Sequence, residues 1–268
     1  MENEDAFPAN LAILLLAAVI LALGGATYSR NKTWKTPASL WGDIVRKSPG
    51  KARPHYNYAT VLAGEGKLDE ALEENLKAID IYPYYGKAYF NIGAIFHTWG
   101  RVDEAIEKYR IAIELKPDIV EAHNNLGYAY YKKGNMDGAF KEYMTVLEIK
   151  PSHVKTYINL GYLFRDTGRL DQAITEYRKA LSYLPDYAPA YHLIGEAYLM
   201  KDEIPAALEG FNAALSLNPA YAEAYNGLGK AYLRMGRTEM AAAAFESALK
   251  INPGLEDAAE NLRLAQGR

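Results

Sequence analysis

The sequence predicts an all-α solenoid of six helix pairs with capping helices, preceded by one transmembrane helix. Two observations support this prediction. Proline, glycine and alanine recur at a fixed interval of 34 residues along most of the 268-residue chain, and residues 9–28 contain no charge. A fixed period of this length indicates a stack of supersecondary units, each too small to bury its apolar face alone. A long uncharged run indicates a helix that can cross a bilayer.

The N-terminal segment ANLAILLLAAVILALGGATY has the length of a membrane span. As a helix its 20 residues rise about 30 Å, the thickness of a bilayer core. A cleaved signal peptide is the alternative, with GGA before Thr27 as a processing site. Signal peptides open with basic residues, whereas this chain opens with Glu2, Glu4 and Asp5. We therefore expect an acidic tail over residues 1–8 and an uncleaved single-pass anchor, a signal anchor with the lipid bilayer as its partner, over residues 9–28.

The charges beside this segment predict its orientation. Arg30, Lys32 and Lys35 follow it, and no lysine or arginine precedes it. By the positive-inside rule the C-terminal body lies in the cytoplasm. An extracytoplasmic, periplasmic position is the alternative.

Composition and motifs argue against several classes of function. A net charge of −3 gives no electrostatic basis for binding nucleic acid. The absence of cysteine excludes disulfides and thiolate zinc sites. Walker A, HExxH and GxSxG motifs are also absent from the sequence, and GLGK at 227–230 falls inside a predicted helix. His55 and His123 occupy aromatic packing positions. We expect no enzymatic activity, no catalytic residue, no cofactor and no metal.

Three series of residues define the 34-residue interval. Prolines occupy positions 49, 83, 117, 151, 185, 219 and 253; glycines occupy 93, 127, 161, 195 and 229; alanines occupy 71, 105, 139, 173, 207 and 241. A second glycine series runs through 66, 100, 134, 168 and 236, with Asp202 as its exception.

The segment 120–153, VEAHNNLGYAYYKKGNMDGAFKEYMTVLEIKPSH, shows what each position does. Leu126 and Tyr130 lie on the buried face of a first helix, helix A. Gly127 allows a neighbouring helix to approach closely. Gly134 can adopt the left-handed conformation that ends helix A. Pro151 closes the unit after helix B, because proline cannot continue a helix.

This pattern resembles the tetratricopeptide repeat (TPR) family, which implies a right-handed superhelix. The aromatic, Leu-Gly and alanine slots of the family are filled in the fourth unit by Tyr157, Leu160, Gly161, Phe164, Ala173, Tyr177, Ala180 and Pro185. The six predicted units are residues 52–85, 86–119, 120–153, 154–187, 188–221 and 222–255. They are flanked by a juxtamembrane linker and capping helix over 29–51 and a C-terminal capping helix over 256–268. In the fifth unit, Asp202 and Pro205 predict a slightly altered turn.

The resemblance also places a binding site. In this family, helix A lines a concave groove, and its sixth residue here reads Asn57, Asn91, Asn125 and Asn159. The row resembles the asparagine ladder in the repeat domain of O-GlcNAc transferase, whose amides grip the backbone of an extended peptide. The other candidate groove residues are Tyr56, Phe90, Asn124, Tyr128, Tyr131, Tyr162 and Arg165. The alternative is that the amides bond to each other between helices.

Three functions follow as predictions. The first is a membrane-anchored scaffold that binds extended peptide or protein segments in the groove and mediates complex assembly. The second rests on RNKTW and LWGDIVRKSPGKARPHYN, which resemble the junction after the last membrane helix of polytopic transmembrane-and-TPR proteins, relatives of membrane glycosyltransferases. Their repeats lie outside the cytoplasm, and their catalytic portion has no counterpart here, so we expect an accessory or truncated relative. The third is a self-assembling homo-oligomer.

Overall fold

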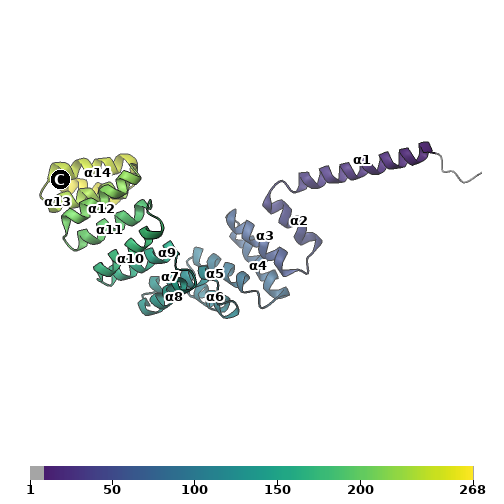
Figure 1. Ribbon diagram of the computed structural model, residues 1–268, viewed down its shortest axis with the longest axis horizontal. Helices are drawn as coiled ribbons and strands as arrows, with labels where there is room; N and C mark the ends of the chain where they lie inside the picture. The colour runs from purple at the N-terminus through teal and green to yellow at the C-terminus, as the bar shows by residue number, and fades with distance from the viewer. Residues whose placement is uncertain (1–8, 268) are drawn as a thin grey trace, which may run out of the picture. The chain divides into compact units, whose positions relative to one another are not determined.

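A computed structural model describes residues 9–267, and the predicted acidic tail over residues 1–8 lies outside them. The described residues form an all-α repeat array of fifteen helices (Figure 1). The helices are α1 (Ala9–Thr33), α2 (Pro37–Lys47), α3 (Ala52–Gly64), α4 (Leu68–Ile81), α5 (Gly86–Thr98), α6 (Val102–Leu115), α7 (Val120–Lys132), α8 (Met136–Ile149), α9 (Val154–Asp166), α10 (Leu170–Tyr183), α11 (Ala188–Met200), α12 (Ile204–Leu217), α13 (Ala222–Arg234), α14 (Thr238–Ile251) and α15 (Glu256–Ala265).

The helices divide into two compact units. Unit 1 ends at Ile119 and contains α1 to α6, and unit 2 begins at Val120 and contains α7 to α15. Within each unit every helix packs on the next, and successive A helices also touch: α3 contacts α5, α7 contacts α9, and α13 contacts both α11 and α15. The predicted repeats had given no sign of a division between the second and third pairs.

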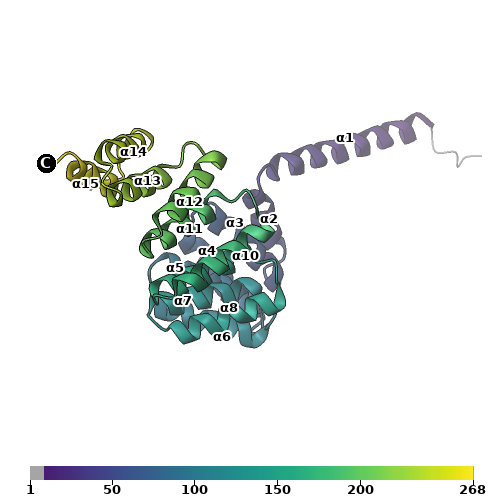
Figure 2. The same ribbon diagram turned by 60° about the vertical axis from the view of Figure 1, so that its left-hand side comes forward.

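Each helical hairpin has the same build (Figure 2). The A helices have 13 residues and the B helices 14. The turn glycines 66, 100, 134, 168 and 236 have φ between 70° and 77°, the left-handed conformation that glycine adopts without strain. Asp202 takes the same conformation, with φ 61°. The prediction of an altered turn in the fifth unit is therefore wrong. Asp202 adopts the left-handed conformation, and Glu203 N–H donates to Tyr198 C=O in the same way as Arg101 N–H donates to Phe96 C=O.

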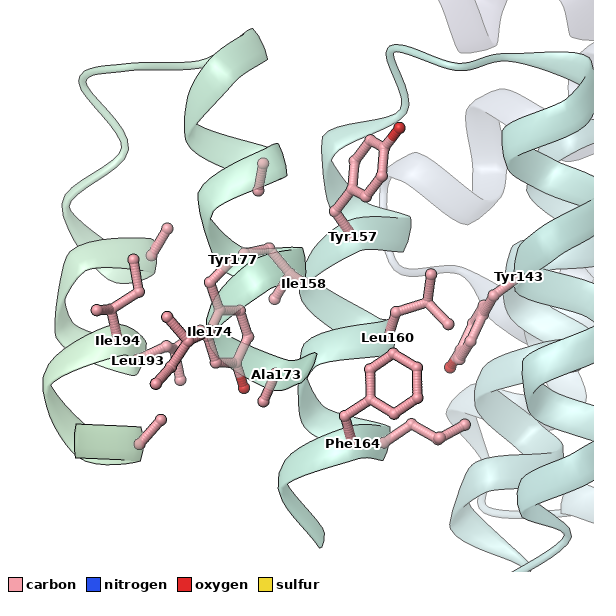
Figure 3. Close-up of a cluster of buried hydrophobic side chains, with 14 of the residues drawn as sticks. Tyr143, Tyr157, Ile158, Leu160, Phe164, Ala173, Ile174, Tyr177, Leu193 and Ile194 are labelled. Atoms are coloured by element: carbon pink, nitrogen blue, oxygen red, sulfur yellow. The ribbon is translucent and has the colours of Figure 1, made fainter. Parts of the chain in front are cut away.

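Helix A approaches helix B over a glycine in each of the five units that carry one. A Cβ built on Gly127 would lie 2.7 Å from the Tyr143 ring, and one on Gly161 would lie 2.0 Å from the Tyr177 ring. The rings at this position of helix B are fully buried: Tyr109, Tyr143, Tyr177, Phe211 and Phe245. Figure 3 shows Tyr177 beside Ile174, with Leu193 and Ile194 of α11 next to it. The 34-residue glycine and aromatic series therefore specify the core.

Both ends of the array carry extra helices. Before α3, α2 starts with a capping box between Thr36 and Ser39, and Asp43, 5% exposed, accepts from Trp34 Nε1 at 3.0 Å. Arg46 and Lys47 also bond to Asp43, each at 2.5 Å. After α14, α15 buries Ala258.

The N-terminal helix α1 makes no apolar core of its own. It runs through residue 28 to Thr33 without a break, longer than the predicted span. Its segment Ala12–Ser29 has a mean hydropathy of 2.1, and none of it is buried in the protein. An apolar helix exposed on all sides is the pattern of a membrane span or a signal sequence.

Candidate functional site

The residues predicted to line a groove lie on the A helices of both units. Unit 1 carries Tyr56 and Asn57 on α3 and Phe90 and Asn91 on α5, and all four are partly exposed. Asn57 and Asn91 occupy equivalent positions of helices that touch. Two partly exposed amides thus follow each other along the A-helix face of unit 1.

A pocket of about 330 Å³ opens beside Asn57. Its lining consists of Arg53, Tyr56, Asn57, Tyr84, Tyr85, Gly86, Lys87, Leu115 and Lys116. The Tyr56 and Tyr85 rings meet at 5.1 Å between centroids. Among the described residues, the Asn57 amide has no hydrogen-bond partner. Its donors and its acceptor are therefore free to bind a ligand.

A second, smaller pocket of about 190 Å³ opens beside Asn91. Its lining consists of Thr60, Ala63, Leu68, Asn91, Ala94, Ile95 and Thr98. Asn91 Nδ2 donates to Thr60 Oγ1 at 3.1 Å, an exposed contact. This bond orients the amide and leaves its oxygen available.

The asparagines of the A helices in unit 2 are arranged differently. Asn124 is 2% exposed and Asn159 7% exposed. Asn124 Oδ1 accepts from Asn159 Nδ2 at 3.1 Å and from Thr156 Oγ1 at 3.0 Å. Asn125 stays partly exposed, and its Oδ1 accepts a long bond from Asn124 Nδ2 at 3.4 Å. In this unit the amides bond to each other between helices, which is the arrangement that the sequence left open.

The same bond occurs again at the C-terminal end. Asn226 Oδ1 accepts from Asn261 Nδ2 at 3.2 Å, and Asn226 Nδ2 donates to Asp257 Oδ2 at 2.7 Å. Asn261 lies in α15 at the sixth position of a further helix A. Our sequence analysis missed it, although it continues the 34-residue asparagine series at 57, 91, 125 and 159.

The tyrosine and arginine side chains predicted for unit 2 form one network. The Tyr131 hydroxyl donates to Asp166 Oδ2, and Arg165 Nε donates to Asp166 Oδ1 at 2.8 Å. The Arg165 guanidinium lies 5.0 Å from the Tyr162 ring centroid, and the Tyr128 and Tyr131 rings are 6.2 Å apart. Burial, followed by the bond to Asp166, raises the pKa of Tyr131 to about 12. The network holds these side chains together through their own contacts.

Three histidines make side-chain contacts between helices. His55 Nδ1 lies 2.6 Å from Glu74, and His123 Nδ1 lies 2.6 Å from Glu142, each pair joining helix A to helix B. His192 contacts the Phe211 and Tyr221 rings at 5.6 and 5.3 Å. Burial lowers its pKa to about 4. A search of the described residues found no group of three or more side chains able to hold a metal ion.

These observations define a helical-repeat protein whose A helices present the candidate site. The TPR repeat family model matches residues 95–134, 127–164, 161–202 and 195–236, and the related tetratricopeptide repeat models match 222–255 and 52–74. The chain belongs to the tetratricopeptide repeat family. This confirms the resemblance predicted from the sequence.

Known proteins resemble parts of the chain. Human Protein O-mannosyl-transferase TMTC1 is 30% identical over 80 residues, which is 30% of this chain and 9% of that protein. The solved structure of the APC/C hetero-tetramer Cut9-Hcn1 has a TM-score of 0.71 at 21% identity, covering 88% of this chain and 47% of that one. The structure of YrrB, described as a TPR protein with an unusual peptide-binding site, has a TM-score of 0.58 at 21% identity, covering 70% and 96%. The chain thus spans under a tenth of the human relative and about half of the matched chain in the Cut9-Hcn1 structure.

Proposed function

We propose that this chain is a non-enzymatic, membrane-anchored scaffold that binds extended peptide or protein segments along its A-helix face. One observation carries this proposal: Asn57 and Asn91 stand on touching helices of unit 1, partly exposed, and each lines a pocket. An amide offers a donor and an acceptor. Two amides in register can therefore hydrogen-bond to the main chain of an extended peptide without reading its sequence.

Within each unit the A helices present the binding face in this proposal, as the family implies. YrrB supports the peptide ligand, because its structure is described as having a peptide-binding site. In unit 2, Asn125, Tyr128 and Arg165 are partly exposed residues of the corresponding A-helix face. Asn124 and Asn159 support the helices beneath it.

The binding experiment uses the full chain in detergent micelles and a degenerate pool of 12-residue peptides, with binding measured by fluorescence anisotropy. Replacing both Asn57 and Asn91 with alanine should weaken binding about tenfold, because each amide hydrogen bond contributes about 0.5–1.5 kcal/mol. The melting temperature should stay the same. Asn212→Ala, an exposed asparagine of helix B in α12, is the matched control. Unchanged peptide binding in the double variant would contradict the proposal.

We propose that α1 anchors the scaffold in a membrane, with the repeats on the cytoplasmic side. The uncharged run of residues 9–28 and the exposure of Ala12–Ser29 support the anchor, and Arg30, Lys32 and Lys35 support the orientation. The chain has no native cysteine, so Lys51→Cys gives a single reporter. In intact cells an impermeant thiol reagent should leave it unlabelled. Labelling would place the repeats outside the cytoplasm, and a shortened mature N-terminus in mass spectrometry would indicate a cleaved signal.

A second candidate is an accessory role beside a membrane glycosyltransferase. The similarity to Protein O-mannosyl-transferase TMTC1 over 80 residues favours it. Proximity labelling from the full chain in its native cell tests it: enrichment of a polytopic glycosyltransferase would support this role, whereas enrichment of unrelated soluble proteins would favour the general scaffold. Self-assembly is the third candidate, and sedimentation of the full chain in detergent measures it directly.

A further inference from the structure

The pocket beside Asn57 carries an unbalanced positive charge. Arg53, Lys87 and Lys116 line it, and its lining contains no aspartate or glutamate. Lys116 lies 3.7 Å from Asp118. Among the described residues, Arg53 and Lys87 have no carboxylate within ion-pair distance. Two cationic side chains at this pocket therefore have no counter-charge among the residues that the structure describes.

Neutral hydrogen-bond donors surround these cations. The Tyr56 and Tyr85 rings pack together at the pocket. Burial raises the pKa of Tyr85, the Tyr56 hydroxyl adds to this effect, and Arg53 opposes it. The positive charge of Arg53 is therefore close enough to favour the ionised form of the Tyr85 hydroxyl. With the unpaired amide of Asn57, the pocket gathers guanidinium, ammonium, hydroxyl and amide donors.

We propose that this pocket receives a phosphate monoester on the peptide that the A-helix face binds, so that the partner is a phosphorylated segment. The inference rests on the proposed peptide-binding function. A phosphomonoester carries a charge of about −1.5 to −2 at neutral pH, which matches the two unbalanced cations. A single carboxylate would leave one of them uncompensated. Three phosphate oxygens can also accept from several donors at once, and arginine binds them in a bidentate manner.

The dimensions and the position of the pocket fit this ligand. A volume of about 330 Å³ is at the small end of ligand pockets, which run from about 300 to 1,000 Å³, and leaves room for the side chain that bears the phosphate. Asn57 belongs both to the pocket lining and to the amide pair on the A-helix face. A peptide held at its main chain by Asn57 can therefore place the adjacent side chain between Arg53 and Lys87.

The test compares three pools of 12-residue peptides that are degenerate except for a central phosphoserine, glutamate or serine. The full chain in detergent micelles should bind the phosphoserine pool about tenfold more tightly than the serine pool, with the glutamate pool between them, because charge-assisted hydrogen bonds are roughly twice as strong as neutral ones. Replacing both Arg53 and Lys87 with glutamine should bring the three pools to equal affinity. Arg110→Gln with Lys141→Gln, two exposed helix-B cations, should leave the preference intact.

The outcomes distinguish a failure of the phosphate site from a failure of the proposed peptide-binding function. Equal affinity of the wild-type chain for all three pools overturns the phosphate site, even where Asn57 and Asn91 still prove necessary for peptide binding. A loss of the same size for every pool in the Arg53→Gln, Lys87→Gln variant also overturns it. If inorganic phosphate binds the pocket to saturation but displaces none of the peptide pools, the pocket is a site for free phosphate. That result would overturn the assignment to a phosphorylated peptide. Unchanged affinity for all three pools in the Asn57→Ala, Asn91→Ala variant, with the phosphoserine preference retained, would keep the phosphate site and contradict the proposed amide contacts.

Discussion

The A helices of both units carry asparagine at the sixth position of the repeat. The residue at the fifth position decides whether such an amide stays at the surface or forms a hydrogen bond between helices. In unit 1 the fifth position holds Tyr56 and Phe90, which offer no amide, so Asn57 and Asn91 remain at the surface. In unit 2 the fifth position holds Asn124, which accepts the amide of Asn159 from the next helix. An asparagine at the fifth position of the preceding A helix thus draws a surface amide into a buried hydrogen bond between helices.

The tightest contact between helix A and helix B lies in one hairpin of unit 2. A Cβ on Gly161 would lie 2.0 Å from the Tyr177 ring, whereas one on Gly93 of unit 1 and one on Gly127 of unit 2 would each lie 2.7 Å from the facing ring. The difference therefore belongs to the Gly161 hairpin and not to the whole of unit 2.

The largest expected effect tests this tighter packing. Gly161→Ala should destabilise the fold by about 3 kcal/mol, because the methyl group forces the fully buried Tyr177 ring to move. Gly93→Ala should cost less. Urea unfolding of the full chain in micelles, followed by circular dichroism, measures both. Gly64→Ala is the control, since a Cβ there meets nothing within 4 Å. Equal losses at positions 93 and 161 would contradict the packing difference between these two hairpins.

The next effect concerns the water-poor surroundings of His192 in unit 2. Burial lowers its pKa to about 4, below the value of about 6.5 in an unfolded chain. The folded state therefore disfavours the proton, so the stability is full above pH 6.5 and falls as the pH drops toward 4. Between pH 7.5 and 5 the loss should be about 2 kcal/mol.

The variant His192→Phe separates the contribution of His192 to the pH dependence of stability from that of the other titrating groups. Its ring can still pack on Phe211 and Tyr221. The free energy of unfolding of the variant should change with pH by about 2 kcal/mol less than that of the wild type over the same interval. Parallel pH profiles would show that His192 is hydrated in the folded chain.

A third prediction separates the asparagines of the two units. Asn124→Ala should cost about 1–2 kcal/mol, because it leaves the buried Asn159 amide without its acceptor and removes one of the two hydrogen bonds of Thr156. Asn57→Ala should change the free energy of unfolding by less than about 0.5 kcal/mol, as surface substitutions do. Denaturant unfolding measures both values, and the peptide pool measures the opposite ranking for binding. A larger stability loss at Asn57 than at Asn124 would reverse the comparison.

The sequence predicted the hairpins well because each position depends on local chemistry. Gly134 ends a helix because its backbone can adopt a positive φ. Gly127 leaves room for one close contact with the Tyr143 ring. The fate of the asparagines was less predictable, since it depends on a residue 35 positions earlier, as in Asn124 with Asn159 and Asn226 with Asn261. That offset was present in the sequence.

The division of the chain at Ile119 and the charged pocket beside Asn57 could not be predicted from periodicity. The repeat pattern continues unchanged through residue 119, so nothing local marks a boundary. The pocket brings together the starts of α3 and α5 and the end of α6. Only the packing of three helices shows that Arg53, Lys87 and Lys116 share one site.

The smallest effect belongs to the turns, where the two units agree. Asp202 holds a left-handed backbone like that of Gly66 and Gly168, at a cost of about 1–2 kcal/mol for a residue with a Cβ. Its carboxylate contacts Arg234 at 2.9 Å, an exposed pair that returns about 0–1 kcal/mol. Asp202→Gly should therefore stabilise the fold by about 0.5–1 kcal/mol. The reverse change, Gly168→Asp, should destabilise it by a similar amount, because the residue equivalent to Arg234 in that repeat is Met200. Melting curves of the two variants measure both signs. A destabilised Asp202→Gly would show that the Arg234 contact outweighs the backbone strain.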